Sequence, residues 1–169
     1  MKLKNTTLTV VTLAVLTALY VVLSAFLKIN IIGDIQLDLG YLAFAVALCM
    51  FGIKGAVVGI IGCALESLLF SAYGFSTSWT VANAIIGIGC GLVFMKTENY
   101  IWRLISIILF CTIGLLGAKT GIECVLYHIP LGVKIVKNAV AFGIDTIVMI
   151  FGLSLYRLIY KRLPKTMRA

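Results

Sequence analysis

The sequence has 169 residues, of which 62% are hydrophobic and only 12% are charged, and its mean hydropathy is +1.15. Ordinary globular domains carry about a quarter charged residues, so this composition excludes a water-soluble fold. A spanning helix needs about 20 apolar residues, and the chain therefore predicts an all-α membrane protein with one membrane domain over residues 1–169. We attribute the net charge of +8 to membrane orientation and anionic lipid, not to nucleic acid.

Uninterrupted apolar runs predict six transmembrane helices, at about 8–27, 39–51, 55–72, 79–95, 101–127 and 131–156. A polar loop over 28–38 separates the first two helices, and a second one over 73–78 precedes the fourth. The fifth run is long enough to be tilted or broken near Gly114 and Gly117. Pro130 ends it, because proline disfavours helical geometry at the residue before it.

Lysine and arginine are distributed unevenly between the two ends of these helices. If the N-terminus lies inside, ten of the fourteen basic residues lie on one side, including Lys54, Lys96, Arg103 and the C-terminal tail. The opposite side carries the acidic loop residues Asp34 and Asp38. Cytoplasmic loops and ends carry the excess positive charge, so six spans with both termini in the cytoplasm is the predicted topology.

Several ionisable and amide side chains lie inside the predicted spans, where they are costly and usually face a cavity or a partner. At 1.5 Å per residue, nearly all of them fall in the outer halves of four different helices, and only Asp145 approaches the middle. They are Glu66, Asn83, Lys119, Glu123, Lys134, Lys137, Asn138 and Asp145. This distribution predicts a pocket that opens outward above a dry inner floor. The alternative for any one residue is a structural ion pair, Lys119 with Glu123 or Lys134 with Asp145, or snorkelling to the interface.

The sequence predicts neither a cofactor nor enzymatic chemistry. Five scattered cysteines form no CxxC pair, and His128 has no second histidine to join it, so no disulfide framework or metal site is predicted. A GxxxxGK[ST] phosphate loop is absent, as is any pairing of nucleophile and base. We therefore expect binding or transport, with no metal and no cofactor.

A series of small-residue motifs runs through the first three predicted helices. Ala14 and Ala18 form an AxxxA motif in the first helix, and Phe51-Gly52-Ile53-Lys54-Gly55 follows the short second one. In this order, and over the whole chain, the features resemble the substrate-binding S components of energy-coupling factor (ECF) transporters. In that family the corresponding motif is FG-x-x-x-G, whereas in this chain the last glycine, Gly55, comes one position earlier.

The resemblance implies a subunit that captures a water-soluble vitamin or related micronutrient from outside, in the bacterial plasma membrane. Ala14 and Ala18 would dock on a transmembrane coupling subunit that bears two cytoplasmic ATPases. The implied substrate-binding residues are Asp34, Gln36, Asp38, Tyr73, Trp79, Asn83, Lys119, Glu123, Tyr127, Lys137 and Asn138, with Glu66, His128, Lys134 and Asp145 as further pocket candidates.

In this interpretation aromatic rings stack on a flat heterocycle, amides read its edge, a lysine neutralises a carboxylate or phosphate, and loop 30–38 closes the pocket. The choice among folate-like, riboflavin-like, pantothenate-like and other substrates stays open. Two other classes are alternatives: a small proton-coupled multidrug or cation exporter that uses Glu66 as its cation-binding carboxylate, and a membrane enzyme.

Overall fold

The computed structural model describes residues 6–27, 29–32, 35–71 and 74–162, with the backbone alone at 29–32, 35, 36, 161 and 162. Helices make up most of this part of the chain. The elements are α1 (Thr6–Phe26), β1 (Ile29–Ile32), β2 (Ile35–Leu37), α2 (Gly40–Phe51), the 3₁₀ turn η1 (Gly52–Gly55), α3 (Ala56–Phe70), α4 (Thr77–Lys96), α5 (Tyr100–Cys111), the π-helix η2 (Thr112–Lys119), α6 (Thr120–Tyr127) and α7 (Leu131–Arg162).

Five stretches of the described chain are long and apolar enough to cross a membrane: Thr6–Phe26, Gly40–Phe70, Thr77–Lys96, Tyr100–Tyr127 and Leu131–Tyr160. The prediction of a helical, multi-pass membrane protein is therefore confirmed. Many apolar side chains point outward from these helices, among them Val15, Phe70 and Phe151. Such an apolar exterior suits contact with lipid rather than with water.

The stretch Gly40–Phe70 contains two antiparallel helices. A Cβ at Gly55 would meet the backbone of Ala47, and one at Gly59 would meet the ring of Phe44. Residues further along the second helix thus contact residues earlier in the first helix, which is the arrangement of a helical hairpin. Its turn begins at Gly52, whose φ of +57° is in the region that glycine adopts without strain.

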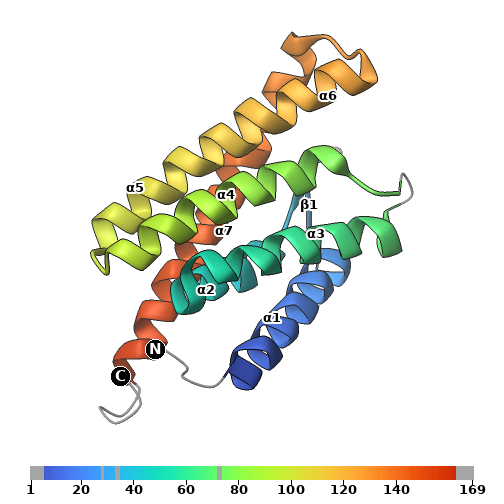
Figure 1. Cartoon of the computed structure of the whole chain (residues 1–169). Helices are drawn as coiled ribbons and strands as arrows, with labels where there is room; N and C mark the ends of the chain where they lie inside the picture. The colour runs from blue at the N-terminus through green and yellow to red at the C-terminus, as the bar shows by residue number, and fades with distance from the viewer. Residues whose placement is uncertain (1–5, 28, 33–34, 72–73, 163–169) are drawn as a thin grey trace.

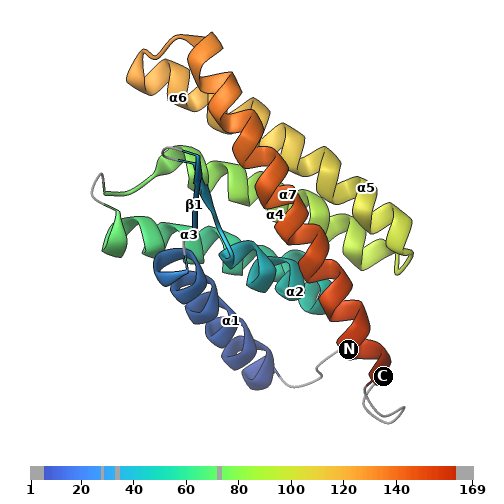
Figure 2. The ribbon, with the colours of Figure 1, turned by 180° about the vertical axis from the view of Figure 1, so that it is seen from behind.

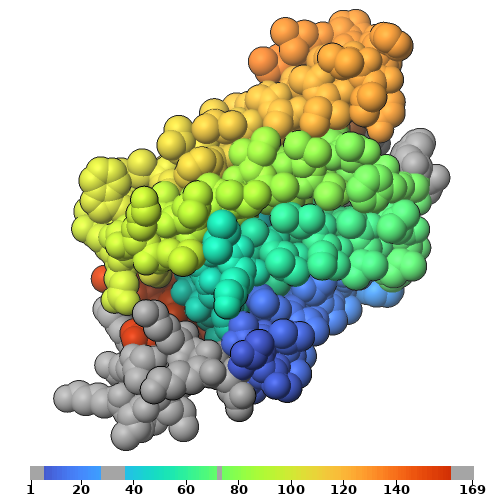
Figure 3. All heavy atoms as spheres, viewed as in Figure 1, coloured from blue at the N-terminus to red at the C-terminus, as the bar shows by residue number. Residues whose placement is uncertain are grey.

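The helices pack with α7 crossing the back of the bundle beside α2, while α5, α4, α3 and α1 follow one another across the front (Figures 1, 2 and 3). The start of α1 and the end of α7 lie at the same end of the bundle (Figure 1). This end also holds η1, the end of α4 and the start of α5. We call it the basic end, after Lys54, Lys96, Arg103 and Arg157.

The opposite end, which we call the polar end, holds the last turns of α1 and α6, the first turns of α2, α4 and α7, and a two-stranded sheet. β1 and β2 pair antiparallel, with Ile29 opposite Leu37 and Asn30 opposite Gln36. The sequence predicted only a polar loop here. Its alternation of β-branched and polar residues is compatible with a strand, but three- and four-residue strands are too short to stand out from a loop.

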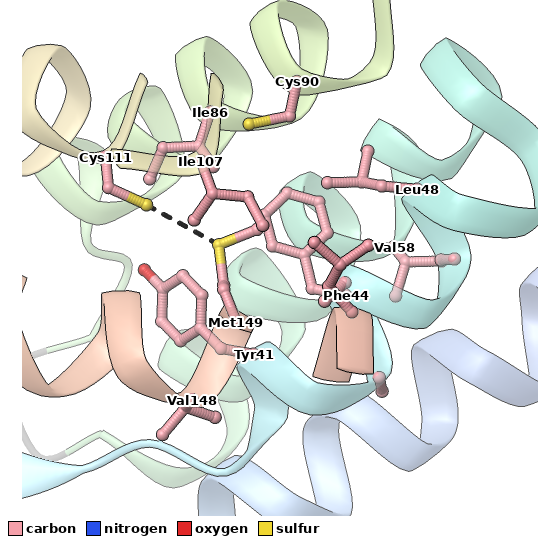
Figure 4. Packing of buried hydrophobic residues seen from close by; sticks show 14 of the residues in the cluster. Tyr41, Phe44, Leu48, Val58, Ile86, Cys90, Ile107, Cys111, Val148 and Met149 are labelled. Atoms are coloured by element: carbon pink, nitrogen blue, oxygen red, sulfur yellow. Dashed lines mark hydrogen bonds between the residues drawn. The ribbon is translucent and has the colours of Figure 1, made fainter. Parts of the chain in front are cut away.

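Between the two ends lies a dry core. Phe44, Leu48, Ile86, Ile107 and Met149 are fully buried and come from α2, α4, α5 and α7 (Figure 4). The Cys111 thiol donates to the Met149 sulfur at 3.6 Å (Figure 4), as expected of cysteines that act as small packing residues.

Candidate functional site

A buried polar network at the polar end joins α4, α6 and α7 through the carboxylate of Glu123. Ser78 Oγ donates to Glu123 Oε1 at 3.3 Å, and Asn138 Nδ2 donates to Oε2 at 3.2 Å. Lys134 Nζ lies 3.2 Å from the same Oε2. The turn between α6 and α7 makes this possible, because His128 is left-handed (φ 52°) and Pro130 starts the chain back beside α6.

Lys119 occupies the centre of the network, with only 4% of its surface exposed. Its ammonium donates to Asn138 Oδ1 at 2.8 Å, lies 3.9 Å from Glu123 Oε1, and sits 3.7 Å from the ring centroid of Trp79. A buried cation is tolerated when a counter-charge, a hydrogen bond and an aromatic face surround it. The predicted residues Trp79, Lys119, Glu123 and Asn138 are thus brought together.

Asn138 uses both of its N–H donors and one lone pair of its oxygen in the network. Besides its bonds to Lys119 and Glu123, its Nδ2 donates to Thr120 Oγ1 at 2.9 Å. Thr120 and Ser78 were not predicted to be site residues. Hydroxyls in membrane helices commonly bond to their own backbone, so neither carries a distinguishing signal in the sequence.

Deeper in the bundle, a group of buried polar atoms lacks hydrogen-bond partners in the described part of the chain. They are Tyr41 Oη, Asn83 Oδ1, both carboxylate oxygens of Asp145 and Thr146 Oγ1. The Asn83 Nδ2 lies 3.5 Å from the Tyr20 hydroxyl, the Asn83 side chain is also within hydrogen-bonding reach of the Cys63 thiol, and the rings of Tyr20 and Tyr41 are 6.4 Å apart. Unpaired buried polar atoms are rare and call for an explanation. The group borders the network along α7, because Asp145 follows Asn138 by seven residues, about 10 Å along the helix.

Asp38 has a structural role in this arrangement. Its Oδ1 accepts from Ser24 Oγ at 2.6 Å and from the Gly40 amide at 2.8 Å. It thereby satisfies a free amide at the start of α2 and ties the last turn of α1 to it.

The remaining predicted site residues are more dispersed. Tyr127, His128 and Lys137 are exposed, and Glu66 is half-buried on α3. Asp34 and Tyr73 lie outside the described residues, as does the side chain of Gln36. Whether any of these contacts a ligand stays a prediction.

Of the two ion pairs considered from the sequence, Lys119 with Glu123 is present and Lys134 with Asp145 is replaced. Lys134 pairs with Glu123, because it lies near the start of α7 whereas Asp145 is about 16 Å further along the same helix. Among the described residues no group of three or more His, Cys, Asp or Glu is placed to hold a metal ion.

Comparison with known proteins gives matches to a family, to a curated relative and to a solved structure. Residues 4–162 match the family of the ECF-type riboflavin transporter, S component. A UPF0397 protein of Streptococcus thermophilus is 32% identical over 135 residues, which cover 78% of this chain and 72% of that protein. The crystal structure of the S component for biotin from an ECF-type ABC transporter superposes with a TM-score of 0.69 over 99% of this chain and 98% of that one. At 19% identity, the last match establishes the fold alone.

Proposed function

Since the chain belongs to the S-component family of ECF-type riboflavin transporters, and is therefore a substrate-binding subunit for vitamin uptake and not an enzyme, we propose that its polar end is the vitamin site. In this proposal the ligand enters from outside between the first turns of α2, α4 and α7 and the last turn of α6. It binds with high affinity against the dry core and is then passed on through an ATP-driven complex.

The unpaired atoms of Tyr41, Asn83 and Asp145 are the observation that supports this function best. Leaving a buried donor or acceptor unpaired costs about 1 to 3 kcal/mol each. A flat heterocycle with N–H and C=O groups on one edge would satisfy them together, with the Tyr20 and Tyr41 rings beside it. Binding would then return part of that cost as affinity.

The polar network has a different role in the proposal. Both N–H donors of Asn138 and one lone pair of its oxygen are bonded within the protein, so in the proposal it holds Lys119 and Glu123 in place and donates no hydrogen bond to the ligand. Lys134 lies at the edge of the network with 19% of its side chain exposed, so it is the cation placed to meet an acidic group of a ligand, such as a carboxylate or phosphate. The partly buried Trp79 is the aromatic ring of the network on which we propose that a flat ligand stacks.

The first test is to purify the protein in detergent, identify co-purifying small molecules by mass spectrometry, and titrate riboflavin as the first probe. We expect Asp145→Asn and Asn83→Leu to weaken binding of the identified ligand by about tenfold or more. Ser154→Ala, which removes a hydroxyl at the basic end bonded to Tyr100, is the matched control and leaves affinity unchanged. Equal effects of all three variants would contradict the assignment of the site.

We further propose six membrane crossings with the basic end in the cytoplasm. The α2–α3 hairpin supplies two of the crossings, and Lys54, Lys96, Arg103 and Arg157 supply the positive charge that stays inside. In a cysteine-free background, Phe75→Cys should react with a membrane-impermeant maleimide in whole cells, and Glu98→Cys should not. The reverse pattern would invert the topology.

The partner in the complex is proposed to dock on α1. Ala14 and Ala18 are exposed on this helix, next to the exposed Val11, Val15 and Val22. Small residues let a second helix approach closely, as contact with a transmembrane coupling subunit attached to two ATPases requires. We expect Ala14→Trp with Ala18→Trp to abolish uptake while ligand affinity is kept. Loss of affinity would instead place α1 in the pocket wall.

A further inference from the structure

The helix that carries Lys119 and Glu123 changes its winding before it reaches them. Between α5 and α6, residues Thr112–Lys119 form a π-helix, and the Thr120 hydroxyl accordingly reaches the Leu115 carbonyl five residues earlier, at 3.2 Å. Short π-helical segments accommodate an extra residue within an α-helix and often occur at functional sites.

The buried residues of this helix follow one another at intervals of four. Ile107, Cys111, Leu115, Lys119 and Glu123 are all buried. In an α-helix each residue turns by about 100°, so four residues overshoot a full turn by about 40°. Along a continuous α-helix Lys119 would lie about 120° around the axis from Ile107, and Glu123 about 160°. Both would face away from α4 and α7.

One extra residue absorbed by the π-helix removes about 100° of this rotation. Lys119 then lies about 20° from Ile107 and Glu123 about 60°, which agrees with their burial against α4 and α7. The segment also packs tightly on α4, because a Cβ at Gly114 would come within 2.9 Å of the Ala82 carbonyl oxygen. Gly117, by contrast, is exposed, and its Cβ would meet only the Thr112 oxygen at 4.0 Å.

We propose that the π-helix Thr112–Lys119 is the positioning element of the site: the one residue that it absorbs turns Lys119 and Glu123 inward to Trp79, Asn138 and Lys134. The inference concerns the site of the proposed function and rests on that function for its biological meaning. Its geometric content is independent of any ligand. If the π-helix did not absorb this one residue, Ala118 and Ile122 would take the inward positions. The side of the network formed by this helix would then be apolar.

The proposal gives opposite expectations for removing and adding a residue. Deletion of Gly117 takes away the extra residue, so the helix continues as α and Lys119 and Glu123 stay inward. Insertion of an alanine between Gly117 and Ala118 turns them about 100° outward. Trp79 reports the result without ligand, since Lys119 lies over its ring and the chain has only two tryptophans. In a Trp102→Phe background, the change in Trp79 fluorescence emission caused by Lys119→Met serves as the reference for loss of the contact.

We expect the insertion to reproduce the emission change of Lys119→Met, and the deletion to leave the emission as in the parent. An alanine inserted after Val125, beyond both residues, is the matched control and leaves it unchanged. The rescue variant moves each charged side chain one position toward the N-terminus by exchanging it with its neighbour: Ala118→Lys with Lys119→Ala, and Ile122→Glu with Glu123→Ile. This exchange should remove the contact at normal length and restore it in the insertion variant.

Loss of the Trp79 contact on deletion of Gly117, or failure of the exchange to restore it in the insertion variant, would overturn the proposal. Riboflavin titration of the same variants is the second readout, with about tenfold weaker binding expected for the insertion. If the emission pattern holds while no variant and no parent protein binds a vitamin, the positioning role stands and the proposed function fails.

Discussion

Polar side chains at the basic end are neutral or partly exposed and bond both within and between helices, whereas the polar end buries two charged side chains, Lys119 and Glu123, in bonds between helices. At the basic end, Ser106 donates to the Arg103 carbonyl and Ser154 to the Ile150 carbonyl, and Arg103 bonds the Thr97 and Phe94 carbonyls at the end of α4. At the polar end, Ser78, Glu123 and Asn138 come from three helices.

The burial of charge decides which end is more sensitive to movement of the helices. A neutral or partly exposed group that loses a hydrogen bond to another helix costs little free energy, because water or its own helix can replace the partner. A buried charge depends on the relative position and register of the helices that surround it, and it responds when a ligand or partner changes either. The basic end is therefore suited to be a fixed base and the polar end to be a site.

Glu123→Ala should have the largest effect on stability. It leaves Lys119 buried without its counter-charge, and breaking a buried ion pair on one side costs about 3 to 5 kcal/mol. Thermal unfolding in detergent measures the loss. Lys119→Met combined with Glu123→Leu should recover most of it, because no uncompensated charge is then buried. Glu98→Ala, at an exposed position of the basic end, should change stability by less than about 0.5 kcal/mol.

The two asparagines Asn138 and Asn99 offer a comparison with the same chemical change at each end. Asn138→Ala removes three hydrogen bonds between helices, two of them to charged groups, and should cost about 2 to 3 kcal/mol. Asn99→Ala removes one cap, its Oδ1 bond to the Ile101 amide at 3.0 Å, and should cost about 1 kcal/mol. Ligand affinity should fall only for Asn138→Ala. Equal losses of stability would remove the distinction between the two ends.

Close backbone packing at the basic end is tested by Gly91→Ala. The new Cβ would lie 2.6 Å from Ile53 Cα and 2.8 Å from Ile53 N, so α4 and η1 must separate, at a cost of about 1 to 3 kcal/mol. Ligand affinity of the folded fraction should stay unchanged. Gly121→Ala is the control, because no atom lies within 4 Å of its added Cβ and alanine favours the helix by up to about 1 kcal/mol.

The sequence predicted this molecule best where single-helix physics decides. Most helix ends lie within two residues of the ends of the apolar runs, whereas α7 continues to Arg162, past the predicted end at 156, and the spacing of Lys119, Glu123 and Asn138 placed them at a common depth. The irregularity expected near Gly114 and Gly117 is present as η2. By contrast, the pairing of Lys134 with Glu123 depends on how α6 and α7 meet. The strands at 29–37 depend on pairing with each other, and the unpaired state of Asp145 on its neighbours from other helices.

Small-residue faces show the same limit. The α3 glycines Gly59 and Gly62 receive the rings of Phe44 and Tyr20 from α2 and α1. The α4 glycine Gly87 does meet α3, at Ala56. A small face predicts close approach but does not identify the helix that approaches.

The smallest effect is expected where a cation lies over a ring in contact with solvent or lipid headgroups. Arg157 lies 5.1 Å from the Tyr100 ring centroid at the basic end and is exposed, so Arg157→Met should cost about 0.5 to 1 kcal/mol. The same kind of contact between Lys119 and Trp79 is buried at 3.7 Å, where about 2 kcal/mol is expected. Double-mutant cycles of each pair, with Tyr100→Leu and Trp79→Leu, measure the two coupling energies. A coupling energy at Arg157 as large as that at Lys119 would mean that burial does not strengthen the contact at the polar end. The polar network would then not be distinguished energetically from the basic end.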